Sequence, residues 1–353
     1  MSQTRDRLLA HCRAYPQAKL QDLLKFLHQS AFGCEHLLSD PAAAEARILG
    51  EAPSARPAPP ERLDGPYARL PLSLLQKGLS SQTLTRLFLL SAKPDPSGRE
   101  KLKEKLAVLQ ACAKEEWFPF SEQEVADSVE KWRAAGFPPC RHSEAYRAAY
   151  APAYRVVKSE FLPLLPLLIA LDRANGQGTL AIDGGSASGK TSLAALLSQL
   201  YDATVFHADD FFLRPEQRTE TRLSEPGGNL DRERLIAEVL EPMRQGRIVC
   251  LRRFDCSSLS LRPPEPVVCR GLVILEGSYS SHPAFAPYFR WRAFLEIPPD
   301  EQRRRILQRN GSAAPLFFER WIPLERRYFE ETNAPARCEF RLPAFGSESD
   351  ASQ

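Results

Sequence analysis

The stretch that decides the fold is Gly184-Gly185-Ser186-Ala187-Ser188-Gly189-Lys190-Thr191. It matches the pattern G-x-x-x-x-G-K-[ST] at every fixed position. An apolar run at 179–182 precedes it, and a helix-forming run at 192–197 follows it. Glycines let backbone N–H groups converge on an anion, and the helix presents its positive end to the same point. The stretch therefore predicts a strand, a phosphate-binding loop and a helix, in that order.

Two side chains of this stretch carry chemistry of their own. Lys190 can reach the β- and γ-phosphates of a nucleoside triphosphate, and the Thr191 hydroxyl can bind Mg²⁺. We therefore expect ATP and Mg²⁺ as cofactors. The expected nucleotide-binding residues are Gly184, Gly185, Ser186, Ala187, Ser188, Gly189, Lys190, Thr191 and Ser192.

The composition excludes several classes of protein. The chain of 353 residues is long enough for two domains, and its net charge of +3 comes from bases scattered among acids, so we expect no nucleic-acid partner. The longest apolar run, 161–171, is too short to span a bilayer, so we expect no membrane partner. The eight cysteines include no C-x-x-C pair, and the N-terminus is unlike a signal peptide. Both observations favour a reduced, cytoplasmic protein.

Helical patterns dominate residues 1–150. Leucines recur at helical spacing over 20–27 and over 102–109, and Ser121 with Glu124 has the pattern of a capping box. The sequence therefore predicts a mostly α-helical N-terminal domain.

From residue 177 the pattern changes to strands that alternate with helices. The continuous apolar run at 272–275 suits a parallel sheet with both faces covered. We predict an α/β fold: a three-layer P-loop domain with a parallel sheet over 177–345, preceded by a connecting helical segment over 151–176 and followed by a disordered tail over 346–353. The expected strands are 179–183, 203–207, 248–251, 272–275 and 292–297, and the expected helices lie near 189–200, 231–244 and 299–309.

Acidic residues follow two of the expected strands. Asp209 and Asp210 come after the strand 203–207, at the edge where parallel strands line a ligand crevice. Either carboxylate could accept a proton from a hydroxyl that attacks the γ-phosphate, or could cap the following turn, and Asp209 is the preferred base. Glu276 ends the fourth strand, where an acid can hold Mg²⁺ or its water. Thr191 and Glu276 are therefore the candidate metal ligands.

Four arginines crowd the helix expected at 299–309. Arg305 and Arg309 are four residues apart and share one face. They could close over the phosphates and neutralise charge in the transition state, or they could form a solvated basic face. The candidate catalytic residues are Lys190, Asp209, Arg305 and Arg309.

In this order the motifs resemble the uridine/cytidine kinase family, which includes nicotinamide riboside kinase and phosphoribulokinase. The resemblance covers about 176–335 and rests on the loop at 184–191, Asp209-Asp210-Phe211-Phe212, Leu275-Glu276-Gly277 and the arginines at 303–309. It implies ATP–Mg²⁺-dependent phosphorylation of a hydroxyl on a small molecule, a nucleoside or nucleoside-like acceptor. By position it implies Asp209 as the general base, Glu276 as the acid of the metal site, and Arg305 and Arg309 as the arginines of a lid.

The expected acceptor-binding segment departs from the family's pattern, Tyr-Asp-Phe-x-x-His. This chain keeps Phe254 and Asp255 but places Leu259 near the position of the histidine. A leucine cannot hydrogen-bond a base edge, so specificity for a pyrimidine does not follow from the resemblance. Asp255 and Arg262 are equally open to a structural role. The candidate substrate contacts are Asp209, Phe254, Asp255 and Arg262.

Two polar and aromatic clusters in the first half of the chain belong to none of these motifs. One comprises His28, Gln29, Gly33, Cys34, Glu35 and His36, and the other comprises 140–146 with Tyr150, Tyr154 and Arg155. Their Cys and His spacing is not that of a standard zinc site, so packing roles are the simpler reading. We expect a substrate-sensing or dimerising domain, which leaves a homodimer open, and an independent active site is the weaker alternative.

Two functions fit these observations. The first is a small-molecule kinase, and the second is a regulatory ATP-binding protein in which nucleotide occupancy switches the N-terminal domain. Asp209 favours the kinase, because a pure sensor needs no acid at that place.

Overall fold

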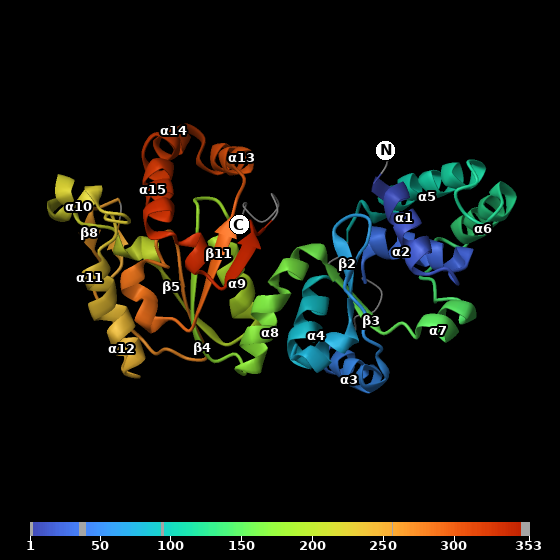
Figure 1. Cartoon of the computed structure of the whole chain (residues 1–353), viewed down its shortest axis with the longest axis horizontal. Helices are drawn as coiled ribbons and strands as arrows, with labels where there is room; N and C mark the ends of the chain where they lie inside the picture. The colour runs from blue at the N-terminus through green and yellow to red at the C-terminus, as the bar shows by residue number, and fades with distance from the viewer. Residues whose placement is uncertain (1–2, 35–39, 93–94, 256, 347–353) are drawn as a thin grey trace. The chain divides into compact units, whose positions relative to one another are not determined.

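The computed structural model describes residues 3–34, 40–92, 95–255 and 257–346 (Figure 1). The chain divides into two compact units, residues 1–172 and 173–353, and each is described here by itself. The tail expected to be disordered, 346–353, lies outside the described residues except for Gly346.

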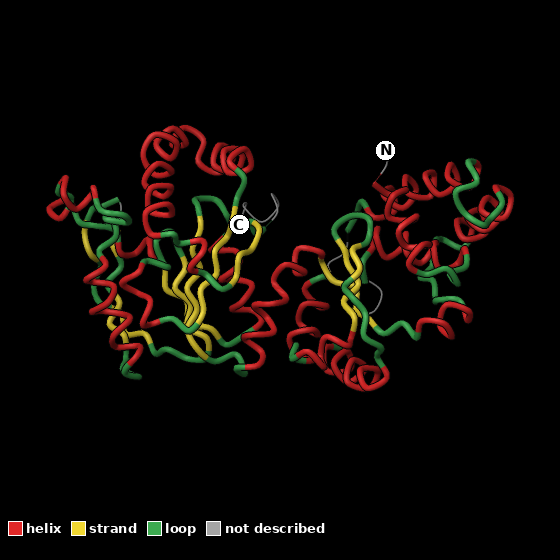
Figure 2. The backbone as a smooth tube through the Cα atoms, in the orientation of Figure 1, coloured by secondary structure: helices red, strands yellow, loops and turns green. Residues whose placement is uncertain are grey.

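The N-terminal unit combines helices with a small antiparallel sheet, drawn in yellow in Figure 2. The sheet has the order β1-β2-β3, with Leu70 of β2 opposite Arg155 of β3. Its strands are β1 (Glu61–Arg62), β2 (Tyr67–Pro71) and β3 (Tyr154–Lys158). The α-helices are α1 (Gln3–Ala14), α2 (Leu20–Phe32), α3 (Pro41–Glu51), α4 (Ser81–Leu90), α5 (Gly98–Lys114), α6 (Glu122–Ala134), α7 (Glu144–Tyr150) and α8 (Leu165–Arg173), and the 3₁₀ turns are η2 (Ala52–Ser54), η3 (Leu72–Lys77) and η4 (Ser159–Leu164).

Helical periodicity and the capping box located three helices of this unit, α2, α5 and α6. Leu23, Leu24 and Leu27 of α2 and the leucines of the α5 stripe are buried, and these two helices pack against each other. Ser121 caps α6 as expected: its hydroxyl accepts from the backbone N–H of Glu124, while the Glu124 carboxylate accepts from the N–H of Ser121. The helical reading of these stretches is confirmed.

The prediction of a connecting helical segment over 151–176 is wrong in its first part. Residues 154–158 form the strand β3, and the N-terminal unit extends to Asp172. Val156 and Val157 are β-branched, which suits a strand, but the partner strand β2 lies more than eighty residues earlier in the chain. Pairing between segments so far apart leaves no periodic signal in either one.

The C-terminal unit is built on a five-stranded parallel sheet with the order β12-β11-β4-β10-β5. Helices flank this sheet in Figure 1, and the predicted α/β fold is confirmed. One face carries Phe206, Val273 and Phe294, which pack with Leu235 and Tyr328 in one core. The strands are β4 (Gly178–Gly184), β5 (Ala203–His207), β10 (Leu272–Glu276), β11 (Trp291–Glu296) and β12 (Phe340–Pro343), and α9 (Lys190–Leu200) packs against β4, β5 and β10.

Two strand assignments differ from expectation. The strand expected at 248–251 is β6 (Val249–Leu251), which pairs antiparallel with β9 (Glu265–Val267) outside the parallel sheet. Its residues alternate between buried and exposed, as suits a strand with one face in solvent. The edge strand β12 was not expected from the sequence.

The remaining elements of this unit lie outside the parallel sheet. The helix expected at 231–244 is α11 (Arg232–Leu235), a π-helical stretch η7 (Ile236–Leu240) and α12 (Glu241–Arg244). The short elements are η5 (Ala208–Phe211), η6 (Pro215–Gln217), α10 (Glu220–Ser224), β7 (Phe254–Asp255), β8 (Ser260–Leu261) and η8 (Pro283–Tyr288). We call residues 299–332 the lid: α13 (Pro299–Asn310), η9 (Gly311–Ala313), α14 (Ala314–Leu316), η10 (Phe317–Trp321) and α15 (Ile322–Thr332), after which η11 (Pro335–Arg337) leads to β12.

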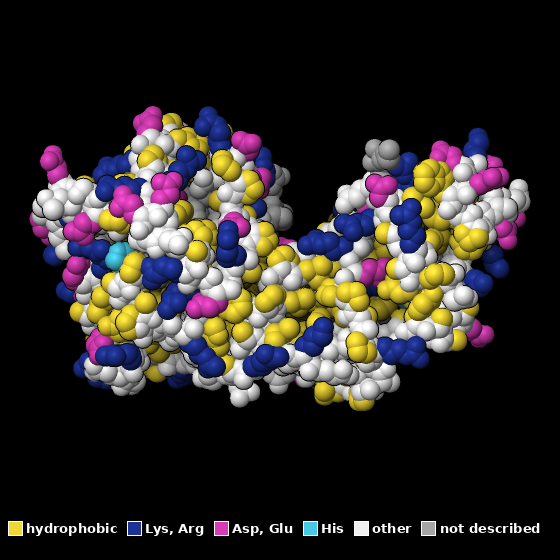
Figure 3. Space-filling model, viewed as in Figure 1, with side chains coloured by type: hydrophobic (Ala, Val, Ile, Leu, Met, Phe, Trp, Pro, Cys, Tyr) yellow, Lys and Arg dark blue, Asp and Glu magenta, His cyan; other side chains and the backbone are white. Residues whose placement is uncertain are grey.

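On the face shown in Figure 3, basic and acidic side chains are interspersed and form no single basic patch. Within the described part of the chain, no helix is both long enough and apolar enough to cross a membrane. The expectations of a small-molecule partner, of no nucleic-acid partner and of a cytoplasmic location stay predictions.

Candidate active site at the ends of the parallel strands

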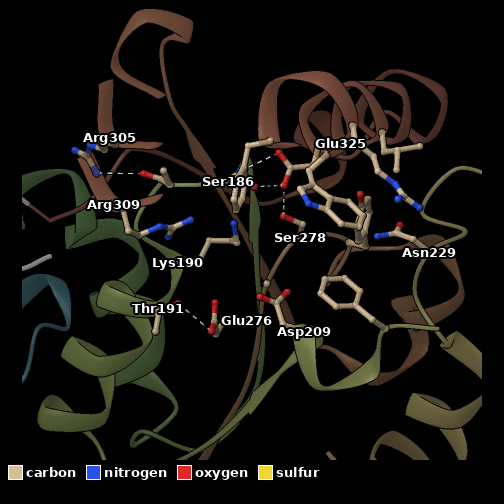
Figure 4. A pocket seen from close by; sticks show the side chains of 18 of the residues that line it. Ser186, Lys190, Thr191, Asp209, Asn229, Glu276, Ser278, Arg305, Arg309 and Glu325 are labelled. Atoms are coloured by element: carbon tan, nitrogen blue, oxygen red, sulfur yellow. Dashed lines mark hydrogen bonds between the residues drawn. The ribbon is translucent and has the colours of Figure 1, made fainter. Parts of the chain in front are cut away.

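A cavity of about 870 Å³ lies at the carboxyl ends of β4, β5 and β10, between the phosphate-binding loop and the lid (Figure 4). Ligands of open α/β sheets bind at this edge of the sheet. Of the nine residues expected to bind nucleotide, six line the cavity, while Gly184, Gly185 and Ser188 are buried in the body of the loop.

The loop is shaped by backbone that only glycine accepts easily. Gly189 has a φ of +91° and precedes α9, and an added Cβ would overlap the carbonyl oxygen of Phe345. The Phe345 N–H donates to the Ser188 oxygen at 2.8 Å, so the segment after β12 supports the loop. Lys190 donates from Nζ to the carbonyl oxygens of Gly184 and Gly185, at 2.9 Å each. Its ammonium therefore lies inside the loop where phosphates would bind.

Thr191 and Glu276 meet although they are 85 residues apart in sequence. The Thr191 hydroxyl donates to Glu276 Oε1 at 3.1 Å, and Glu276 is buried at the end of β10. Oxygen donors of this kind suit Mg²⁺, which takes few protein ligands and completes its shell with water and phosphate oxygens. The two residues therefore fit the expected metal.

His207 was not expected at this site. It ends β5, opposite Glu276 in the sheet register, and its Nδ1 lies 2.6 Å from Glu276 Oε1. The hydrogen bond to Glu276 raises the pKa of His207. This pairing follows from the register of β5 and β10 in the parallel sheet, and no local sequence pattern predicts it.

The geometry separates the two candidate bases. Asp209 lines the cavity, whereas Asp210 does not and instead pairs with Arg253 at 3.5 Å. The Asp209 carboxyl is open to the cavity but surrounded by protein on its other sides, and this loss of bulk water raises its pKa. Lys190 partly opposes the shift, and the nearby Glu276 adds to it.

Arg305 and Arg309 both line the cavity from α13. Arg305 donates to Glu301 at 2.7 Å and to the carbonyl oxygen of Phe345 at 3.0 Å, while Arg309 lies over the Phe317 ring. The other two arginines of this helix, Arg303 and Arg304, do not line the cavity. One face of α13 therefore points at the site.

The acceptor candidates are divided by the structure. Phe254 lines the cavity, but Asp255 and Arg262 do not. Asp255 accepts from Arg262 at 3.1 Å and from the Ser257 hydroxyl at 2.6 Å, within the hairpin of β7 and β8. Their charges therefore hold that hairpin together, and the structural alternative describes them better.

Several lining residues were missed by sequence reasoning. Phe212 and Trp321 stack across the cavity, with ring centroids 6.2 Å apart, and Asn229 contributes a polar group nearby. Glu325, on α15 of the lid, is buried in the same cavity. Phe212 belongs to the motif Asp209-Asp210-Phe211-Phe212, in which only the two aspartates were expected to have a role. Trp321 and Glu325 come from the lid, whose sequence carries no motif for this contact.

The two clusters noted in the first half of the chain meet in the N-terminal unit. His142 Nδ1 lies 2.9 Å from Asp22 Oδ1, and His142 Nε2 lies 2.6 Å from the Tyr154 hydroxyl. Gln29 contacts that hydroxyl and accepts from Arg69 Nε at 2.9 Å. Arg69 then pairs with Glu61, which contacts His11 at 2.6 Å. We call this set the buried polar network: His11, Asp22, Gln29, Glu61, Arg69, His142 and Tyr154.

Burial and hydrogen bonding fix the protonation of this network. Burial lowers the pKa of His142 to about 4, against the opposing effect of Asp22. Burial alone would raise the pKa of Asp22, but hydrogen bonds from His142 and Ser143 lower it below the usual range. A neutral His142 can donate to Asp22 and accept from Tyr154. Among the described residues, no group of three or more His, Cys, Asp or Glu side chains could hold a metal ion, and His36 lies outside them.

No protein-family model matches the chain, and no curated protein matches it. Among solved structures, it is similar to a possible uridine kinase from Bacillus stearothermophilus, with 24% identity over 47% of this chain and 89% of the other and a TM-score of 0.37. It is also similar to a proposed fructose transport system kinase from Silicibacter sp. TM1040 (22% identity, 48% and 88% covered, TM-score 0.37) and to TT1252 from Thermus thermophilus (21%, 50% and 92%, TM-score 0.28). Likenesses this distant do not assign a function, which has to be argued from the cavity itself.

Proposed function

We propose that the C-terminal unit is an ATP–Mg²⁺-dependent kinase that transfers the γ-phosphate to a hydroxyl of a small molecule, a nucleoside or nucleoside-like acceptor. The single observation that carries the proposal is the position of Asp209. Its carboxyl lines the same cavity as Lys190 of the phosphate-binding loop and the Thr191–Glu276 pair. Phosphoryl transfer needs these three components within one site.

The residues of the cavity divide the reaction among them. The loop amides and Lys190 hold the phosphates, and Mg²⁺ at Thr191 and Glu276 would neutralise charge between the β- and γ-phosphates. The acceptor oxygen attacks the γ-phosphorus, the bond to the leaving ADP oxygen breaks, and the hydroxyl proton passes to Asp209. Arg305 and Arg309 lie where they can stabilise the charge that spreads over the transferred group.

The far side of the cavity supports a planar acceptor. Phe212, Phe254 and Trp321 present aromatic surface, Leu259 adds an aliphatic side chain, and Asn229 offers a hydrogen-bonding amide. A mostly apolar pocket with few polar groups is usual for small-molecule sites. A nucleoside-like compound has an aromatic face and a hydroxyl, and it matches this lining.

A regulatory ATP-binding protein is the second candidate. The observation that favours it is the contact of the lid with the phosphate-binding loop: Gln302 donates to the Ser186 oxygen at 3.0 Å, and Arg305 donates to the Ala187 oxygen at 3.4 Å. Binding of a nucleotide would change these contacts, as in proteins whose switch segments are ordered by contacts with a γ-phosphate.

ATP consumption separates the two functions. Purified protein with Mg²⁺ is assayed for ADP formation against nucleosides, nicotinamide riboside, sugars and small hydroxy acids. We expect one class of acceptor to raise ADP formation well above the rate without acceptor. Tight ATP binding with no acceptor-dependent turnover would contradict the kinase and favour the regulatory protein.

A further inference from the structure

The carboxylate of Glu325 is bound by the phosphate-binding loop. Glu325 Oε2 accepts from the backbone N–H of Ser186 at 2.9 Å, and Oε1 accepts from the Ser186 hydroxyl at 2.7 Å (Figure 4). The hydroxyl of Ser278, just after β10, donates to the same Oε1 at 2.7 Å. Glu325 is 4% exposed, so a buried carboxylate occupies donors that belong to the loop.

A phosphate-binding loop uses backbone N–H groups to bind anionic oxygens, and a carboxylate offers oxygens of the same kind. All three donors to Glu325 are uncharged, and among the ion pairs of the described residues none involves Glu325. No ion pair of the described residues neutralises this buried carboxylate, so the hydrogen bonds from Ser186 and Ser278 hold it in place. Glu325 therefore acts toward the loop as an anionic ligand would.

Glu325 is bound on the arm of the loop where we expect the terminal phosphate to bind. The amides at the start of α9, from Lys190 onward, are left for the inner phosphates. Ser186 lies on the other arm of the loop, directly after Gly184 and Gly185, whose carbonyl oxygens bind the Lys190 ammonium that reaches the β- and γ-phosphates. The charge of Glu325 also contributes to the raised pKa of Asp209, the proposed base for attack on the γ-phosphate.

We infer that Glu325 is an internal ligand of the loop, which the γ-phosphate of a nucleoside triphosphate must displace and which a diphosphate leaves in place. The inference rests on the proposed function, because it requires a nucleotide on this loop. One turn later on α15, the Tyr328 hydroxyl donates to Asp183 at 2.8 Å, so the helix stays attached while Glu325 leaves. Displacement frees the Ser186 and Ser278 contacts of α15 and so links the triphosphate to the lid.

The test is the affinity of a non-hydrolysable ATP analogue and of ADP, each with Mg²⁺, measured by calorimetry on the full chain. Glu325→Gln keeps the size of the side chain and removes the charge. If the carboxylate occupies the loop about nine times in ten, its removal tightens binding of the triphosphate analogue about tenfold. Binding of ADP should change by less than about twofold, because a site that does not compete gains nothing from the removal.

Glu319→Gln is the matched control. Glu319 lines the same cavity from η10 and is exposed, with no contact to the loop among those of the described residues. It should leave the ratio of the two affinities as in the wild type. Glu325→Ala is a second variant that shows whether an effect is peculiar to glutamine, and it should change the two affinities as Glu325→Gln does. Thermal melting confirms that both variants fold.

The outcomes are distinguishable. Equal effects of Glu325→Gln on both nucleotides, no effect, or weaker binding of the analogue would overturn the internal ligand and leave the proposed function standing. If neither nucleotide binds the wild type or any variant, the proposed function fails and the inference falls with it.

Discussion

In the N-terminal unit His142 binds both Asp22 and Tyr154, whereas in the C-terminal unit Lys190 and Asp209 face a cavity of about 870 Å³. Both units bury ionisable groups that cost free energy to remove from water. In the first unit that cost is offset by contacts inside the protein. In the second, a ligand can complete the contacts, so substitutions there should change activity and substitutions in the buried polar network should change stability.

The largest expected effect is on turnover. Asp209→Asn should lower phosphoryl transfer by about 10²–10⁴-fold, the usual range for loss of a general base, while nucleotide binding is kept. Asp210→Asn is the control, because Asp210 pairs with Arg253 outside the cavity, and it should stay within about tenfold of the wild type. Steady-state rates with the best acceptor of the screen decide this. Equal losses in both variants would remove Asp209 from its special role.

The raised pKa of Asp209 should also be visible in the dependence of turnover on pH. The carboxylate is the form that accepts the proton, so turnover falls as the pH falls through this pKa. The acidic limb of the rate profile should therefore lie above the range of an ordinary aspartate. A profile that is flat down to pH 4 would speak against a base with a raised pKa.

A smaller effect, and one on stability, is expected in the first unit. Asp22→Ala leaves His142 and the N–H of Ser143 buried without their partner, which should lower the free energy of unfolding by about 2–4 kcal/mol. Hydrogen exchange of peptides covering α2, followed in urea, measures this unit within the full chain. Asp127→Ala on the exposed face of α6 should cost less than about 0.5 kcal/mol. Loss of nucleotide binding in Asp22→Ala would contradict the division between the units.

The smallest expected effect is a slope against pH. The pKa of His142 is about 4 in the folded unit and near 6.5 when unfolded, so between these values the unfolded state binds more protons. Stability of the first unit should therefore fall as the pH is lowered from 6.5 to 4, by at most roughly 1.4 kcal/mol per pH unit from this group. His142→Gln removes the group and should flatten the slope, whatever it does to stability at pH 7. An unchanged slope would show that His142 is not buried in its neutral form.

Local patterns predicted the parts of the molecule that local chemistry decides. The loop at 184–191 is recognisable from glycine, lysine and threonine at fixed spacing. The strand β5 was predicted at 203–207, and the structure has the same bounds. Glu276 was placed at the end of β10 because an acid after an apolar run is conspicuous. These assignments need only a few neighbouring residues.

Contacts between distant segments explain what was missed. The sheet of the N-terminal unit depends on β3 meeting β2, and the site depends on Glu325 meeting Ser186 across 139 residues. Asp255 and Arg262 show the converse: both are polar residues near an expected site, yet they pair with each other across a hairpin. Nothing in a short window of sequence distinguishes a charge that faces a cavity from one that faces its neighbour.

In the strand order β12-β11-β4-β10-β5, the order of the strands in space differs from the order in which they are synthesised. β4 leaves the ribosome before the other strands of its sheet, yet it lies at the centre, between β10 and β11. Neither neighbour exists until residues 272 and 291 have been made. Until then a nascent chain carries an apolar strand with two open edges, the kind of segment that aggregates. In the N-terminal unit the central strand β2 is paired with β1 on one edge from the start and waits only for β3, so a pause in translation leaves one open edge there and two in the second unit.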